Sequence, residues 1–218
     1  MNPQSTGGTD RLPGRSGSRL DMSHDIELPI SVELDDGTPL RLRLGTSDDR
    51  DALLAGFARL TPASRAARFF TGMPNLSDPF LDRLLDIDES HHVAIVAEDT
   101  SRMSDVDEHS MGLGVGVARY IVSSTDATRA DLAVTVIDEY HGRGIGRLLL
   151  DALIDHAVDN GITTWTATVL SVNTKMLRLL ASLGATPRSD PGERSIVELE
   201  IPLGRVGSGA LISTPISA

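Results

Sequence analysis

The spacing of hydrophobic residues changes several times along this chain, and each change predicts a new element. In "SVELDDGTPLRLRL" (31–44), apolar and polar residues alternate on both sides of Asp36 and Gly37, which is typical of a β-hairpin. Five further runs have the length and composition of strands. They are "HHVAIVAED" (91–99), "GLGVGVARYIV" (112–122), "DLAVTVID" (131–138), "TTWTATVLS" (163–171) and "RSIVELEIP" (194–202).

Helical spacing and helix start signals lie between these runs. Thr46 and Asp49 predict a capping box for the first helix, Thr61 and Pro62 start the second, and Ser77 is the expected N-cap of the third. Two later helices end at glycines. The predicted helical ranges are 49–60, 63–70, 77–88, 145–161 and 173–184.

The order of these elements predicts the fold class. A hairpin, three helices, three strands and then alternating helices and strands favour an α/β (α+β) fold, a mixed and mostly antiparallel sheet flanked by helices. We expect one domain over residues 28–204. Residues 1–27 and 205–218 are rich in small and polar residues, which predicts disordered tails.

Composition narrows the classes of function. The chain has 218 residues, no cysteine and a formal net charge of -11. A chain without cysteine has no disulfide or thiol nucleophile and fits the reducing cytoplasm. The acidic balance argues against nucleic acid as a partner. No apolar run approaches the roughly 18 residues that span a bilayer, so we expect no membrane partner.

One acidic segment changes this picture. Between Asp78 and Glu108 there are ten acidic residues and two arginines. This excess of negative charge either attracts a cationic substrate or keeps the surface soluble.

We expect no metal site, because His91 and His92 are adjacent on a strand and point to opposite faces.

The stretch "DEYHGRGIGRLLLDALI", which begins at Asp138, is the main candidate for chemistry. A dinucleotide-binding fingerprint would need a third glycine where this chain has Arg147, and a P-loop would need a Gly-Lys pair, whereas the only lysine is Lys175. A glycine turn before a helix N-terminus favours an anion such as a pyrophosphate. The same turn is also used for tight connections alone, so both interpretations stay open.

A family resemblance favours the anion site. "VTVIDEYHGRGIGRLLLDAL" resembles the acetyl-CoA signature of the GNAT superfamily of N-acyltransferases, with Gly144 and Gly146 at its glycines and His141 where Gln or Arg is usual. "NTKMLRLLASLGA", from Asn173, is similar to the terminal helix of that family. "LTPASRAARFF", "DIDESHHVAIVA" and "GVGVARY" resemble the bacterial protein-lysine acetyltransferases of the Pat type.

This resemblance implies a GNAT fold and a cofactor site. The sheet would splay between the strands at 131–138 and 163–171 to admit the pantetheine arm of acetyl-CoA, and the amides of residues 142–147 would bind the pyrophosphate. No metal is implied. The implied cofactor-binding residues are Val134, Val136, His141, Gly142, Arg143, Gly144, Ile145, Gly146, Arg147 and Asn173.

The chemistry also requires a general base. A lysine amine with a pKa of ~10.4 is neutral in roughly one of a few thousand molecules at pH 7. Asp131 leads an apolar strand and matches the position of the catalytic glutamate in Pat-type enzymes. Because Asp is one methylene shorter than Glu, a bridging water is expected. The alternative is that Asp131 is a turn residue at a strand end.

Several functions remain open. We expect acetyl transfer to a primary amine, first a protein lysine and otherwise a small amine. Leu180 stands where many GNAT enzymes have a tyrosine acid, so a non-catalytic acyl-CoA sensor is a further alternative. Arg65 and Arg68 are expected to pair with nearby acids. The oligomeric state is not predicted.

Overall fold

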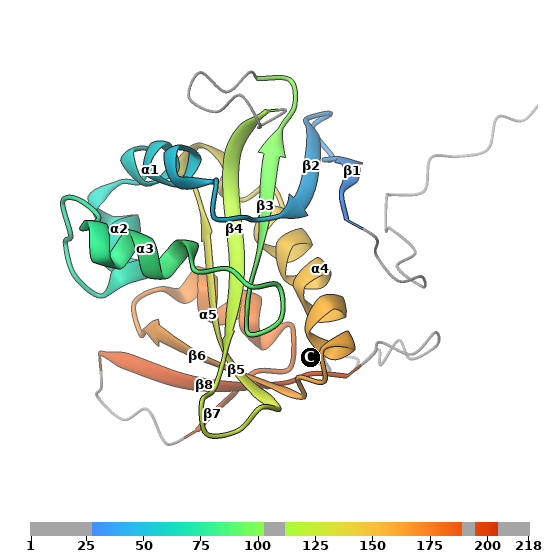
Figure 1. Ribbon diagram of the computed structural model, residues 1–218. Helices are drawn as coiled ribbons and strands as arrows, with labels where there is room; N and C mark the ends of the chain where they lie inside the picture. The colour runs from blue at the N-terminus through green and yellow to red at the C-terminus, as the bar shows by residue number, and fades with distance from the viewer. Residues whose placement is uncertain (1–27, 103–111, 189–194, 205–218) are drawn as a thin grey trace, which may run out of the picture.

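A computed structural model describes residues 28–102, 112–188 and 195–204 of the chain (Figure 1). The predicted tails, 1–27 and 205–218, lie outside these ranges. The described residues form an eight-stranded sheet in the order β1-β2-β3-β4-β5-β6-β8-β7. The strands are β1 (Ile30–Glu33), β2 (Pro39–Leu44), β3 (His92–Asp99), β4 (Leu113–Val122), β5 (Arg129–Val136), β6 (Thr164–Leu170), β7 (Thr186–Pro187) and β8 (Ile196–Pro202).

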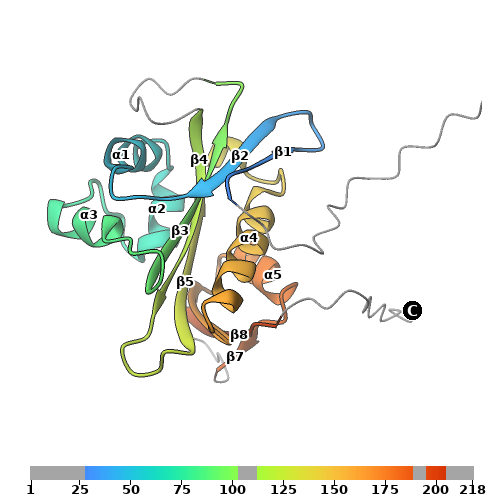
Figure 2. The ribbon, with the colours of Figure 1, turned by 45° about the vertical axis from the view of Figure 1, so that its right-hand side comes forward.

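The helices follow the predicted spacing closely. They are α1 (Arg50–Ala58), α2 (Pro62–Phe69), α3 (Asp78–Leu85), the short 3-10 helix η1 (Asp138–Tyr140), α4 (Ile145–Asp159) and α5 (Thr174–Ala181). Helices α1, α2 and α3 cover one face of the sheet, and α4 and α5 lie on the other (Figure 2). The predicted mixed sheet flanked by helices is therefore confirmed. None of the helices in the described ranges is long and apolar enough to cross a bilayer.

One interruption in the sheet sets the position of the site. All neighbouring strands pair antiparallel except β5 and β6, which run parallel. Their pairing ends at Asp131 and Thr166, although β5 continues to Val136 and β6 to Leu170. The two strands therefore separate over their carboxyl-terminal halves.

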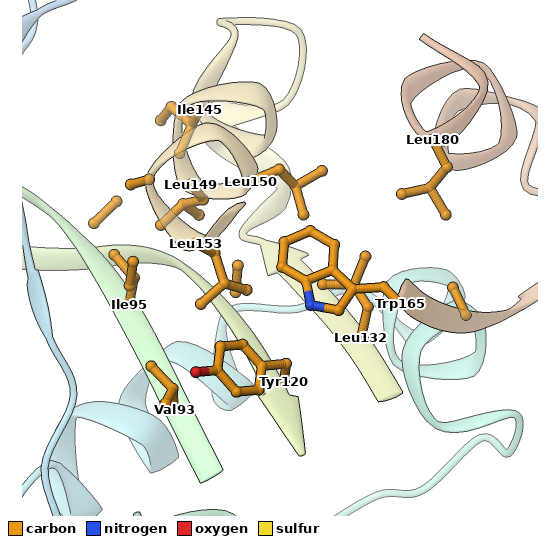
Figure 3. Packing of buried hydrophobic residues seen from close by; sticks show 14 of the residues in the cluster. Val93, Ile95, Tyr120, Leu132, Ile145, Leu149, Leu150, Leu153, Trp165 and Leu180 are labelled. Atoms are coloured by element: carbon orange, nitrogen blue, oxygen red, sulfur yellow. The ribbon is translucent and has the colours of Figure 1, made fainter. Parts of the chain in front are cut away.

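The core on the α4 side holds this splayed sheet together. Leu149, Leu150 and Leu153 of α4 are fully buried and point toward Tyr120 of β4 and Trp165 of β6 (Figure 3). Apolar residues three and four positions apart give α4 one buried stripe, which fits the helical period of the sequence. This packing fixes α4, and with it the glycine turn at its N-terminus, against the centre of the sheet.

The helix starts were predicted correctly with one exception. Thr61 caps α2 by accepting a hydrogen bond from the Ser64 N–H at 3.2 Å. The capping box of α1 is wrong in detail, because α1 begins after Asp49 rather than after Thr46. The Asp49 carboxylate accepts the Thr46 backbone N–H at 2.7 Å, so one hydrogen bond of the predicted box is present ahead of the helix. The same carboxylate also binds Arg43 of β2 at 2.6 and 3.0 Å.

Candidate functional site

The opening between β5 and β6 is flanked by two loops. The glycine turn, 141–144, follows β5, and the Asn173 segment follows β6. Because β5 and β6 are parallel, their carboxyl ends lie at the same edge of the sheet, and crevices at such edges commonly bind ligands. The splay predicted from the sequence is present at this edge.

The glycine turn presents unpaired backbone donors. Gly142 and Gly144 have φ angles of 78° and 85°, in the left-handed region that glycine adopts without strain. Gly144 is the N-cap of α4. Within the described part of the chain, the N–H groups of residues 142–146 donate to no protein acceptor, and no heavy atom lies within 4 Å of a Cβ built at Gly142 or Gly144. The turn is therefore open, and it concentrates donors at a helix N-terminus, which favours an anion.

The side chains of the turn are held in place by contacts within the fold. His141 donates from Nε2 to the Val136 carbonyl at 2.8 Å. Arg143 pairs with Asp36 at 3.4 Å and lies 4.6 Å from the centre of the Tyr140 ring. These contacts place two polar side chains beside the free amides.

At the start of α4, Arg147 bonds Asp151 through Nε at 2.7 and 2.9 Å. Its neighbours face inward, since Ile145 is only 1% exposed and a Cβ at Gly146 would lie 3.3 Å from Leu179. Ile145 and Gly146 therefore offer a ligand their backbone rather than a side chain.

The strand that leads into the turn has one free edge. Val134 and Val136 pair with β4 at Ala118 and Gly116, but no strand of the described ranges pairs with them on the side of β6. Unpaired backbone groups at a strand edge can bond to an extended ligand as a further strand would.

Asp131 lies at the apex of the opening. It is the third residue of β5 and pairs in register with Thr166, the last such pair before the strands separate. The Thr166 hydroxyl donates a hydrogen bond to Asp131 Oδ1. Asp131 is exposed to solvent. The alternative that Asp131 is a turn residue is therefore wrong, and the sequence analysis missed Thr166, which only the parallel register brings to this carboxylate.

The loop after β6 and helix α5 complete the edge. Asn173 caps α5 by accepting the Met176 N–H at 3.2 Å, so its carbonyl oxygen is engaged in the fold. Leu180 is 1% exposed and points into the core toward Trp165 and Leu150 (Figure 3). The position at which many GNAT enzymes have a tyrosine therefore contributes to packing here.

The prediction that Arg65 and Arg68 pair with acids is wrong. Arg65 donates to the carbonyls of Pro74 and Ala58 at 3.0 and 3.2 Å, and no carboxylate pairs with Arg68 among the described residues. Arg68 and the buried Arg119 both line a cavity beneath α1, α2 and α3. Arg119 could have been noticed in the sequence as a charged residue inside the apolar run "GVGVARYIV".

Much of the acidic segment is engaged within the fold. Asp78 and Asp82 both pair with Arg50, at 2.7 and 3.0 Å, and Glu98 binds Arg43 at 2.6 Å. Asp88 accepts the N–H groups of residues 90–92. The acidic residues at 105, 107 and 108 lie outside the described residues. In the ranges the structure covers, no three His, Asp or Glu side chains form a group that could hold a metal ion.

A mixed sheet that splays beside a helix N-terminus is the arrangement of the GNAT fold, and comparisons identify the family. A model of the acetyltransferase (GNAT) family matches residues 65–185. The chain is 32% identical over 164 residues to acetyltransferase PA5475 of Pseudomonas aeruginosa, covering 75% of this chain and 84% of that protein. The chain therefore belongs to the GNAT acetyltransferase family.

Two further proteins place it closer to one branch of that family. Acetyltransferase Pat of Mycolicibacterium smegmatis is 30% identical over 175 residues, which cover 80% of this chain and 49% of that protein. The solved GNAT domain of S. lividans PAT superimposes with a TM-score of 0.69 at 27% identity, covering 80% of this chain and 97% of that domain. The resemblance to Pat-type acetyltransferases is thus confirmed in sequence and in fold.

Proposed function

We propose that this protein transfers the acetyl group of acetyl-CoA to a primary amine, with Asp131 as the general base. One observation carries the proposal: an exposed carboxylate lies at the apex of the splayed strands whose open edge ends in the glycine turn with its free amides. Acyl transfer from acetyl-CoA needs a site for the pyrophosphate and a base for the amine. The helix N-terminus with its free amides and the carboxylate at the same opening can supply them.

The residues around the opening fit acetyl-CoA. The free amides of residues 142–146 would bind the pyrophosphate, with the side chains of Arg143 and Arg147 beside them. The Arg147 amide, which the sequence analysis included, already donates to the Gly144 carbonyl at 3.0 Å. The free edge of β5 at Val134 and Val136 would pair with the amides of the pantetheine arm, and Asn173 would bound the other side. When bound, acetyl-CoA supplies an activated acyl carbon and a thiolate leaving group.

Asp131 would remove the proton of the incoming amine. The amine nitrogen forms a bond to the acetyl carbon, the carbon–sulfur bond breaks, and the amine proton passes to Asp131 directly or through a water. The hydrogen bond from Thr166 orients the carboxylate. The thiolate, with a pKa near ~8.5 for a comparable thiol, can leave without a protein acid, which suits a site with Leu180 in place of tyrosine.

Two acceptors are supported by different observations. The resemblance to Pat favours a protein lysine, as expected from the sequence. Its electrostatic support is weaker, however, because several carboxylates of the acidic segment pair within the fold. The partly open cavity beneath α1, α2 and α3 favours a small amine.

The test separates binding from chemistry. Transfer can be followed with a thiol reagent, because the protein has no cysteine and only released CoA reacts. Asp131→Asn should lower kcat by 100-fold or more, since a general base contributes roughly 10²–10⁴-fold, and should leave acetyl-CoA binding by calorimetry unchanged. Turnover equal to the wild type would remove Asp131 from the mechanism.

A glycine pair tests the cofactor site. Gly144→Glu should abolish acetyl-CoA binding by blocking and repelling the pyrophosphate. Gly161→Glu is the matched control, because Gly161 has a φ of 78° and lies at the opposite end of α4. If both variants bind acetyl-CoA normally, the turn is only a connection. Binding by the wild type with no transfer to any amine would favour the acyl-CoA sensor.

A further inference from the structure

The face of the sheet covered by α1, α2 and α3 contains a cavity that the acetyl-CoA site does not use. It has a volume of about 100 Å³ and lies between these helices and strands β3, β4 and β5, partly open to solvent. Most of its lining is apolar and includes Phe57, Leu85 and Val117. A largely apolar cavity with a few polar groups is the usual form of a small-molecule site.

Two arginines in this lining have no acidic partner among the described residues. Arg119 is 5% exposed and donates to the Leu84 carbonyl at 2.6 Å, and Arg68 lies 5.0 Å from the centre of the Phe69 ring. No carboxylate pairs with either guanidinium in the part of the chain that the structure describes. Burial lowers the pKa of both groups to about 10, and Arg68 contributes to the lowering at Arg119. Both therefore remain cations at neutral pH.

The other ionisable groups near the cavity do not neutralise these charges. Asp49 also lines it, but both its carboxylate oxygens bind Arg43, at 2.6 and 3.0 Å. His92 donates from Nδ1 to the Asp86 carbonyl at 2.7 Å. In the neutral ring, Nε2 is therefore an acceptor, and it lies 3.4 Å from the Arg119 guanidinium. The cavity therefore carries positive charge that the described residues leave unpaired.

An uncompensated buried cation destabilises a folded protein unless a ligand completes the site. Arg119 is such a buried cation, and the half-buried Arg68 in the same cavity repels it, so the pair is unfavourable for stability alone. Charges that are left unpaired at a cost in stability are expected at functional sites. A carboxylate is the natural complement, because it bonds guanidinium groups in a bidentate, charge-assisted way.

The register of the sheet places Asp131 on the same face as this cavity and close to Arg119. Arg119 of β4 lies directly opposite Ala133 of β5, and Asp131 is two residues along β5, on the same face. Diagonal neighbours of this kind are about 7–8 Å apart. Ala133 and Thr135 also line the cavity. One small molecule can therefore place an anion at the arginines and an amine at Asp131.

We infer that the acceptor is a small amino acid, a primary amine whose own carboxylate is bound by Arg68 and Arg119 in this cavity. The inference rests on the proposed function, because the amine is the group that receives the acetyl. A lysine side chain within a protein carries no such carboxylate, so the inference favours the small-molecule candidate over the protein one.

The experiment compares each acceptor with its neutral counterpart. Free amino acids and 4-aminobutanoate are each tested beside the corresponding carboxamide, with a lysine-containing peptide in parallel. A hydrogen bond to a charged group contributes about 1.5–3 kcal/mol, so kcat/KM should favour the carboxylate of the best pair by about 10–150-fold. Equal kcat/KM values for carboxylate and carboxamide, or transfer to the peptide alone, would overturn the inference.

Two arginine variants test whether the preference for a carboxylate comes from this cavity. Arg68→Met keeps the length of the side chain and should reduce the carboxylate preference at least tenfold, through KM. It should also leave Tm equal to or above that of the wild type, because an unpaired cation is removed; a purely structural arginine would lower Tm. Arg83→Met is the control, since Arg83 is exposed on α3 and lies over Phe80 outside the cavity. An unchanged preference in Arg68→Met contradicts the assignment.

Calorimetry distinguishes this inference from the proposed function. An amino acid that binds the wild type more tightly than its carboxamide, but is not acetylated, supports the carboxylate site and contradicts the proposed transfer. Acetylation without any dependence on the carboxylate supports the transfer and contradicts the site.

Discussion

The two faces of the sheet differ in how completely they are packed. On the α4 face, Leu149, Leu150 and Leu153 are fully buried against apolar partners. On the face of α1, α2 and α3, the same strands border a cavity that contains Arg68 and Arg119. The difference indicates a division of roles: the α4 face holds the glycine turn rigidly in place, while the other face leaves room for an acceptor.

Leucine truncation on each face should reveal this division most clearly. Leu153→Ala leaves a new cavity in a filled core and should lower the free energy of unfolding by about 2–5 kcal/mol. Leu53→Ala removes a half-buried side chain that already borders the cavity, so about 1 kcal/mol is expected from the smaller area it buries. Urea denaturation measures both. Equal losses would mean that the two faces are packed alike.

Two glycines on β4 test how tightly α4 packs against the sheet. A Cβ at Gly116 would lie 3.1 Å from Leu149 and 3.2 Å from the Thr135 carbonyl, whereas one at Gly114 meets no atom within 4 Å. Gly116→Ala should therefore cost about 1–3 kcal/mol through overpacking under α4.

The matched substitution Gly114→Ala should stay within about 0.5 kcal/mol of the wild type. Thermal unfolding of the two variants side by side provides the measurement. A tolerated Gly116→Ala would show that α4 can move away from the sheet, contrary to a rigid platform.

The elements that were predicted well from the sequence are those that depend on local features. The hairpin around Gly37 and the helix that begins at Ile145 depend on local spacing and turn chemistry, which single stretches of sequence contain. The glycine turn was found for the same reason, since its conformation requires glycine at Gly142 and Gly144.

The contacts that were missed depend on tertiary structure. Thr166 reaches Asp131 only because two distant strands pair in parallel, and threonine is too common in strands to be noticed alone. Arg68 and Arg119 come from a helix and a strand that meet only when the sheet is covered. The capping box was misplaced rather than absent: Asp49 accepts the Thr46 N–H and also binds Arg43 of β2, but α1 begins only after Asp49.

The smallest expected effect is a loss of stability at low pH, which comes from the face that contains the cavity. Burial, and next the charge of Arg119, lower the pKa of His92 from its ordinary value of 6.5, against the opposing effect of Asp86 and Asp88. Below about pH 6.5 the unfolded chain therefore binds a proton that the folded state resists, so stability falls as the pH falls.

His92→Gln removes this titration. The stability of the wild type relative to His92→Gln should decline between pH 7.5 and pH 5, by no more than the ~1.4 kcal/mol per pH unit that one proton allows. Urea denaturation of both proteins at each pH cancels the titration of the carboxylates that they share. A difference that is independent of pH would mean that His92 takes up its proton beside Arg119 without cost. The charge in the cavity would then be better screened than its apolar lining indicates.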